Sequence, residues 1–472
     1  MALRTVSNTG GNWNATTTWV GGVVPVTADT VDFTATSGNL VVNVTTAPLS
    51  GINFTNYLGT ITFNANISVN TSVNLGTGGY TQAGGGTFGL LIGNSTTITS
   101  NGVSWNNLLT FSGNGQTYTL ADNLIVTGNI VMAGTSSSTF TSNILYIGSN
   151  LTISSTATVL GTTTFNFNGT GTWSHPSTGT VRNNITINTS GTLTVSGNVY
   201  YNTGTLTYIS GTVITTLGAL NISLATTLDT SGMIWNSIIL TGGIQTLLSD
   251  LNVFNLTSGG GGNNTINGLF NVNVSGNSTA NGLVFGTATI VLIGTGLWTA
   301  LNGSNTFRTP VIINTNGVIT LANTLECGGN LTYIKGTVKA NNTTIGFATC
   351  TLINLHKIVF KNVVINVGST VTMNEFFSGS PSIVTNIGSN SVSNYTITFQ
   401  DGFEKIAKFV NISSCTLSKP LQLLVLTKSK LNSRNSGIRY INQSPNGIAK
   451  GEPSVNQTTF GAAGLLPDPI KL

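Results

Sequence analysis

Charged side chains are scarce in this sequence: they make up 6% of 472 residues, whereas soluble globular proteins carry about 25%. Solubility must therefore come from uncharged polar side chains, and Gly, Thr, Asn and Ser fill the positions that Lys and Glu usually take. This composition is unusual for a cytosolic enzyme. Disorder is also excluded, because hydrophobic residues reach 39% and alternate with polar ones in many short stretches.

Cysteines and long apolar runs are scarce as well. Cys327, Cys350 and Cys415 form an odd set without metal-like spacing, so we expect at least one free thiol. No apolar run approaches the roughly 18 residues that a membrane-spanning helix needs, so no membrane span is expected. The opening MALRTVSNTGG lacks the apolar core of a secretory signal. We expect release by another route, or by lysis inside a larger particle.

Short alternating segments are what the sequence has instead. NLVVNV, GTITFN and NNITINTSGTLTV alternate apolar and polar residues and are bounded by Asn, Gly and Ser, which is typical of strands and turns. No long amphipathic helix is found before residue 400. The sequence therefore predicts an all-β fold.

Tryptophans mark an internal repeat. Outside the opening segment they are Trp105, Trp173, Trp235 and Trp298, which recur at intervals of roughly 62–68 residues. WNNLLTFSG from Trp105 matches WNSIILTGG from Trp235, and Phe360 stands where a third copy would place it, about 125 residues beyond Trp235. We expect these five aromatic residues to belong to the repeat core.

The repeat length indicates the fold. A spacing of about 63 residues divides into three coils of about 21, close to one coil of a parallel β-helix, in which successive coils stack at about 4.8 Å. We expect an N-terminal cap over 1–39, a right-handed β-helix over 40–400 and a small β-rich module over 401–472. The segments RNNITINTSGTLTV and RTPVIINTNGVITL, from Arg182 and Arg308, are duplicates. Their shared arginine favours a structural pair, or stacking over a strand end, over a ligand contact.

The open end of such a stack needs a cap, because unpaired strand edges recruit other chains. Trp13 and Trp19 are expected to lie over the exposed apolar core, although both could be ordinary core residues. We expect the rest of the segment to turn the chain, to end pairing and to discourage end-to-end growth. The residues with these three roles are, in order, Gly21 with Gly22, Pro25, and Asp29 with Asp32.

The order of residues in WNATTTWVGGVVPVTADTV, followed by SGINFTNYLGTITFN, resembles the N-terminal segment of β-helical surface proteins encoded by viruses, notably tailed phages. It is similar, more distantly, to the eight-glycine domains that open some extracellular β-helix proteins. The motif ends with the second of these two stretches. The resemblance implies a right-handed parallel β-helix in a virion appendage, fibre or outer shell, often multimeric and in some cases glycan-binding. Catalytic members have clustered carboxylates, which are scarce here, so the enzymatic role is not carried over.

Candidate chemistry is sparse. Asp229 and Asp250 are one expected coil apart, which could bring them to about 5 Å, as in retaining glycosidases. Asp250 has a counterpart in Asp122, however, and a recurring turn aspartate explains both better. His175 and His356 stand in unrelated contexts, and no cluster of metal ligands appears. We expect no catalytic residue, no metal and no cofactor.

Positive charge gathers near the C-terminus: residues 405–451 hold eight basic residues and no acid. Such a face suits docking on an anionic surface, although a solvated strand face is an equal alternative. The expected docking residues are Lys419, Lys428, Lys430, Arg434, Arg439 and Lys450.

The sequence thus predicts a non-enzymatic structural protein of a virion surface, fibre or appendage, located on the virion or outside the cell. Its expected partners are further copies of itself, other virion proteins and surface glycans; nucleic acid is not expected. An exported adhesin or extracellular filament subunit is the first alternative. A carbohydrate-active β-helix of the depolymerase or lyase kind is the second.

Overall fold

The computed structural model describes residues 1–322 apart from 155, 157, 177, 231, 260–262 and 301–305, and then the backbone of the strands between 325 and 448. Side chains are described up to residue 336, apart from the same residues and 217, 306, 323–330 and 333. The chain forms two compact units, Met1–Ile239 and Leu240–Leu472.

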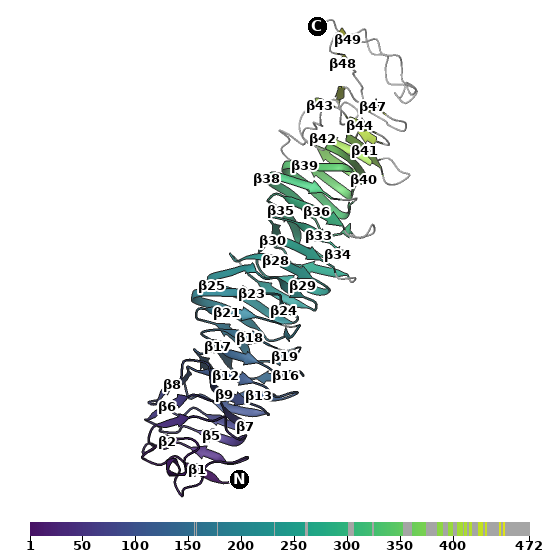
Figure 1. Cartoon of the computed structure of the whole chain (residues 1–472). Helices are drawn as coiled ribbons and strands as arrows, with labels where there is room; N and C mark the ends of the chain where they lie inside the picture. Colours follow the sequence, from purple (N-terminus) through teal and green to yellow (C-terminus); the bar gives the residue numbers. More distant parts are fainter. Residues whose placement is uncertain are drawn as a thin grey trace. The chain divides into compact units, whose positions relative to one another are not determined.

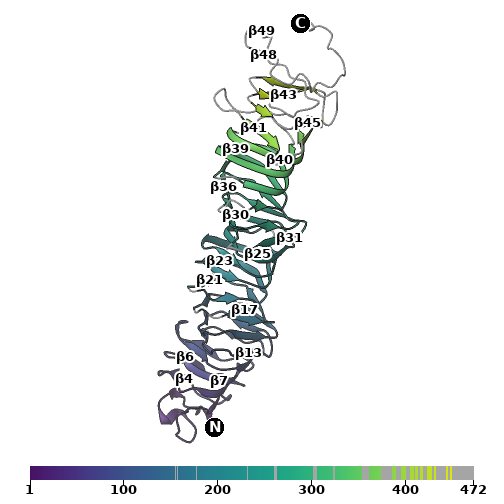
Figure 2. The same cartoon turned by 90° about the vertical axis from the view of Figure 1, so that its right-hand side faces the viewer.

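The first unit is a stack of coils built mainly from short strands. A strand pairs in parallel with its counterpart one coil later, as β12 (Leu108–Phe111), β15 (Ile130–Met132) and β18 (Leu151–Ile153) do (Figure 1, Figure 2). In this register Leu109 lies beside Ile130, which lies beside Leu151, so one coil holds about 21 residues. The predicted parallel β-solenoid and its coil length are confirmed.

The strands of the first unit form three parallel series and one smaller sheet. The first series consists of β1 (Leu3–Thr5), β3 (Thr30–Asp32), β5 (Leu49–Asn53), β7 (Ile67–Asn74), β10 (Thr96–Thr99), β13 (Thr117–Leu120), β16 (Ser138–Thr141), β19 (Thr158–Gly161), β22 (Thr180–Val181), β24 (Val199–Tyr201) and β26 (Leu220–Ile222). The second consists of β11 (Ser104–Trp105), β14 (Leu124–Val126), β17 (Ile144–Ile147), β20 (Thr164–Phe167), β23 (Ile185–Ser196), β25 (Gly204–Leu217) and β27 (Thr226–Asp229). The third contains β9 (Gly89–Ile92), β12, β15, β18 and β21 (Gly171–Ser174), which pairs with the second half of β23. The smaller sheet contains β2 (Gly11–Asn12), β4 (Leu40–Val42), β6 (Thr60–Phe63) and β8 (Thr81–Ala83).

The second unit repeats this construction. β28 (Ile234–Leu240) ends at Leu240, the first residue of this unit. The strands that follow are β29 (Gly243–Leu247), β30 (Leu251–Ser258), β31 (Asn264–Asn267), β32 (Asn271–Val274), β33 (Ser278–Ala280), β34 (Val284–Phe285), β35 (Thr289–Leu292), β36 (Gly296–Ala300), β37 (Thr306–Phe307), β38 (Val311–Leu321), β39 (Leu325–Leu352) and β40 (Lys361–Met373). Their backbone pairings are again parallel, for example β30 with β32 and β32 with β35. The residues described beyond β40 form nine short strands: β41 (Thr385–Ser389), β42 (Tyr395–Phe399), β43 (Glu404–Lys408), β44 (Val410–Ile412), β45 (Cys415–Leu417), β46 (Leu423–Thr427), β47 (Lys430–Leu431), β48 (Gln443–Ser444) and β49 (Gly447–Ile448).

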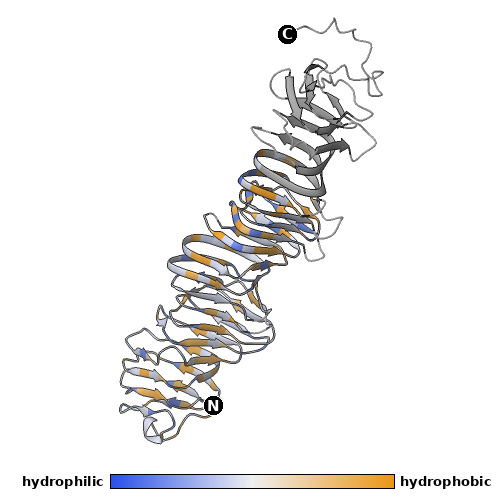
Figure 3. Ribbon diagram, turned by 45° about the horizontal axis from the view of Figure 1, so that its top comes forward, coloured by the Kyte–Doolittle hydropathy of each residue, from blue (hydrophilic) through white to orange (hydrophobic). Residues whose placement is uncertain are grey.

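Columns of apolar side chains fill the interior of the coils. Val126, Ile147, Phe167 and Ile187 lie beside one another in successive coils, and all four are buried. Figure 3 shows the corresponding alternation of hydrophobic and hydrophilic residues along the strands. Each such side chain contributes about 1.5–3 kcal/mol by its burial, so the period-two pattern also fixes which face of each strand points inward.

The duplicated segments adopt the same local structure. Thr189 in β23 accepts a hydrogen bond from the Gly191 N–H at 2.9 Å and donates to the Gly169 carbonyl at 2.9 Å. Thr315 in β38, its counterpart in the second copy, makes the equivalent bonds with Gly317 and Gly294, both at 2.8 Å. The sequence duplication therefore carries the same irregularity in strand pairing, a register shift between Asn188 and Thr192 and between Asn314 and Val318.

Helical structure in the described part is limited to the turn Thr16–Thr18. Among those residues, no helix is long and apolar enough to cross a membrane.

Candidate functional site

Trp13 and Trp19 form a closed pair at the N-terminal end of the first unit. Each is 2% exposed, their ring centroids are 4.9 Å apart, and the rings meet edge to face at 74°. The Trp19 indole N–H donates to the Trp13 carbonyl at 2.8 Å, and the Trp13 N–H donates to the Val41 carbonyl at 2.8 Å. The two side chains thus fill the interior where the stack begins, and the Trp19 indole N–H finds a partner there.

The loop after Trp19 turns on two glycines. Gly21 and Gly22 have φ of 79° and 70°, and the Gly22 N–H donates to the Trp19 carbonyl at 2.9 Å. A Cβ at either position would meet nothing within 4 Å. Glycine is therefore selected here by backbone conformation and not by lack of space. Pro25 follows and is buried.

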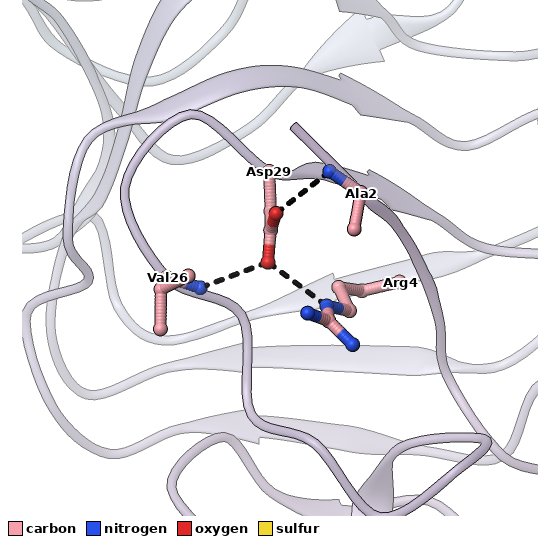
Figure 4. Close-up of polar contacts among 4 residues, drawn as sticks. All are labelled: Ala2, Arg4, Val26 and Asp29. Atoms are coloured by element: carbon pink, nitrogen blue, oxygen red, sulfur yellow. Dashed lines mark hydrogen bonds and ion pairs between the residues drawn. The ribbon is translucent and has the colours of Figure 1, made fainter.

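Asp29 fastens the first strand to this loop (Figure 4). Its Oδ1 accepts the Ala2 N–H at 2.8 Å, and its Oδ2 accepts Arg4 Nε–H at 2.8 Å and the Val26 N–H at 3.2 Å. The residue is 3% exposed. The bond from Arg4, helped by the two backbone bonds, outweighs burial and lowers the pKa of Asp29 to about 2. The charge of Asp29 is therefore used inside the end of the unit.

Asp32 belongs to a ladder of polar side chains that runs from coil to coil. In register it lies between Thr5 and Asn53, and Asn53 lies beside Asn74. The Asn53 amide donates to Asp32 Oδ1 at 2.7 Å. Asn74 accepts in turn from the amide of Asn101 at 3.0 Å. The ladder ties successive coils together with a single formal charge at its start.

The four repeat tryptophans that the structure describes are all buried, with at most 1% exposed. Trp173 lies beside Leu151 in the third series, whereas Trp105 lies beside Val126 in the second. The two therefore stand on different sides of the coil, because the interval between them is longer than three whole coils. Phe360 lies outside the described residues.

His175 makes a buried pair with Trp173. The Trp173 indole N–H donates to His175 Nε2 at 2.9 Å, and His175 Nδ1 lies 2.7 Å from the Gly179 carbonyl. Because Nε2 accepts, Nδ1 carries the proton and donates. The Tyr200 N–H, 3.3 Å from Nδ1, is then only a longer contact. Burial lowers the pKa of His175 to about 4, so the imidazole is neutral.

Two further aspartates accept hydrogen bonds from the backbone of an adjacent coil. Asp122 accepts the backbone N–H groups of Ser100 and Asn101 at 2.7 and 2.6 Å, and Asp250 accepts that of Asn271 at 2.9 Å. Asp122 thus bonds to the preceding coil and Asp250 to the following one, so the two do not share one contact, and the recurring turn aspartate stays a prediction. Asp229, the other member of the hypothetical acid pair, ends β27 and is half-buried.

Arg308 stacks on an aromatic ring. Its guanidinium carbon lies 5.2 Å from the Phe285 centroid, within the range of a cation–π contact. For this arginine, the stacking that its repeat position suggested is confirmed.

Clustered metal ligands are not found in the described part. It holds no group of three or more His, Cys, Asp or Glu side chains that could bind a metal. An interior gap of about 10 Å³ is lined by apolar residues, among them Val73, Leu90 and Trp105. A gap of that size and polarity suits neither a ligand nor an ordered water.

The basic C-terminal segment is described only in part. Lys430 lies in β47, for which the backbone alone is described. The other expected docking residues lie outside the described residues: Lys419, Lys428, Arg434, Arg439 and Lys450.

The sequence analysis missed one surface feature at the N-terminal end. Leu3, Val20, Val23 and Val26 are between 43% and 65% exposed. The segment VGGVVPV could have suggested it, because its two glycines hold neighbouring valines on a projecting turn.

Compared with known proteins, the chain matches no family model, no curated protein and no solved structure.

Proposed function

We propose that this chain is a non-enzymatic structural protein, a β-solenoid subunit of a virion surface, fibre or appendage that assembles outside the cell. The observation that carries the proposal is the use of its ionisable side chains. Asp29, Asp122 and Asp250 accept backbone hydrogen bonds that hold turns and coils together, and His175 is held between Trp173 and Gly179. These groups serve the architecture, whereas a catalytic pair would have to converge on a surface groove.

The polar surface supports the same role. Asn, Thr and Ser side chains bond from coil to coil, as Asn273 does with Asn252 at 2.9 Å and Thr180 with Thr158 at 3.1 Å. Such ladders stiffen a coil stack without adding charge. A virion location is supported by the resemblance of the N-terminal segment, from WNATTTWVGG to SGINFTNYLGTITFN, to phage-encoded β-helical surface proteins.

The basic C-terminal segment is proposed as a docking surface for an anionic neighbour, either another subunit or a surface glycan. Its charge balance supports this assignment, since residues 335–472 hold 13 basic and 5 acidic side chains. Replacing Lys428, Lys430, Arg434 and Arg439 together by glutamine should weaken assembly and leave the coils folded. Unchanged assembly of that variant would contradict the docking role.

Electron microscopy of the purified chain at increasing concentration tests the proposed function. Ordered pairs, sheets or filaments are expected. Single particles at every concentration would contradict a self-assembling subunit. A glycan array with the same preparation tests the contact with host sugars.

A further inference from the structure

The N-terminal end of the first unit carries an apolar patch formed by Leu3, Val20, Val23 and Val26, with exposures of 65%, 62%, 43% and 55%. Backbone bonds hold the segments of the patch together. The Val20 N–H donates to the Thr5 carbonyl at 2.9 Å, and the Thr30 N–H donates to the Ala2 carbonyl at 2.8 Å. The four side chains therefore belong to one end of the stack and are not scattered along it.

The same end presents a strand edge. β1 pairs in parallel with β3 along Leu3–Thr5. On its other edge, Val20 covers Thr5, and Val6 bridges to Trp19. The described residues place no strand beside Leu3 and Arg4 on that edge. An edge of this kind offers backbone groups to another chain.

Charge does not protect this edge. Arg4 is the only charged residue among residues 1–28, and its Nε–H is bound to Asp29 at 2.8 Å. Natural edge strands are usually blunted by charged side chains, above all lysine. Because the one charged side chain here is paired with Asp29, side-chain charge does little to repel an identical surface or to attract a strongly charged partner.

We propose that the N-terminal apolar patch is a joint at which a second copy of this chain docks head to head. The inference rests on the proposed self-assembly and names its partner and its contact surface. An uncharged apolar patch is complementary to itself, and a twofold contact buries the same residues on both copies. Such a contact occupies the N-terminal ends of both copies, so growth stops at the joint. Trp13 and Trp19 close the interior behind the patch on each copy.

Sedimentation of the full chain tests the joint. The wild type should contain pairs whose Kd rises about tenfold or more in the variant Val20→Asp, Val23→Asp, Val26→Asp, because each buried unpaired charge opposes the contact. The matched control is Ile209→Asp with Ile234→Asp, two isoleucines that are 58% and 63% exposed elsewhere on the first unit. The control should pair as the wild type does. Circular dichroism of all three proteins checks that each is folded.

The outcomes separate this inference from the proposed function. If the wild type assembles and the valine variant assembles equally well, the joint lies elsewhere; the inference then fails and the structural role stands. If the wild type remains single at every concentration, both fail. A third outcome is a wild type that stays single and floats with phosphatidylcholine vesicles, while the valine variant does not float. That result would assign the patch to lipid and overturn the second-copy assignment.

Discussion

Trp173 donates its indole N–H to His175 Nε2 across 2.9 Å, and the pair lies at a corner of the first unit with His175 only 4% exposed. The bond requires Nε2 to be unprotonated, since a protonated nitrogen would face another donor. One coil thus depends on a neutral histidine.

The first prediction concerns acid. Burial lowers the pKa of His175 from 6.5 to about 4, so below pH 6.5 the unfolded chain takes up a proton that the folded chain refuses. The contribution of His175 is complete above pH 6.5 and is lost as the pH falls toward 4, at up to about 1.4 kcal/mol per pH unit. Denaturation of the wild type and of His175→Gln, followed by circular dichroism, should diverge in that window. Parallel pH profiles would contradict the prediction.

The second prediction concerns the Asp29 contact. Asp29→Ala removes a charged bond and leaves the Ala2 and Val26 N–H groups without their acceptor, which costs about 2–4 kcal/mol. Hydrogen exchange should accelerate in β1 and in the loop before β3. Asp32→Asn is the matched control, because asparagine already occupies the next two rungs of its ladder at Asn53 and Asn74. Equal exchange in both variants would show that Asp29 has no special role.

The acid dependence of Asp29 has a different cause from that of His175, because hydrogen bonds and not burial lower its pKa. Its folded pKa of about 2 lies below the ordinary value of 3.8. Its contribution is therefore present above pH 3.8 and is lost as the pH falls toward 2. In Asp29→Asn this loss should disappear, as hydrogen exchange of β1 against pH can show.

The third prediction concerns the interior closure. Trp13→Ala with Trp19→Ala empties the first coil, and each truncation costs about 3–5 kcal/mol. The opened strands should then recruit further chains and produce end-to-end aggregates, visible by light scattering and electron microscopy. A double variant whose association state matches the wild type would contradict the closing role.

The fourth prediction concerns the close approach of two coils. A Cβ at Gly89 would overlap the Leu108 carbonyl oxygen, whereas at Gly93 the nearest atom is Asn70 Oδ1 at 3.0 Å, the far end of a side chain. Gly89→Ala should destabilise the first unit by about 2–3 kcal/mol, and Gly93→Ala by less than about 1 kcal/mol. Urea denaturation measures both. Equal losses would show that the coils can separate locally.

Much of the fold could be predicted from sequence, because a coil repeats one local pattern. The tryptophan spacings indicated the coil length, and the alternation of apolar and polar residues indicated the strands. The side on which Trp105 lies could not be predicted, because an offset of a few residues moves a side chain around a corner without changing the local pattern.

The site was less predictable, because some of its contacts join residues of different coils. The bond between Arg4 and Asp29 depends on how the first strand pairs with β3. The His175 contact could not be inferred from the repeat, because Trp298, the counterpart of Trp173 in the second copy, is followed by Ala300 at the histidine position. The exposed valines look like core residues in sequence, and only the projecting glycine turn places them outside.

The short sequence distance between paired residues also bears on how the protein is made. Leu109 finds its partner Ile130 one coil later, and Asp29 finds Ala2 less than two coils back. The first unit can therefore fold in order of synthesis, closing its N-terminal end while later coils are still on the ribosome, because no contact need wait for a distant segment.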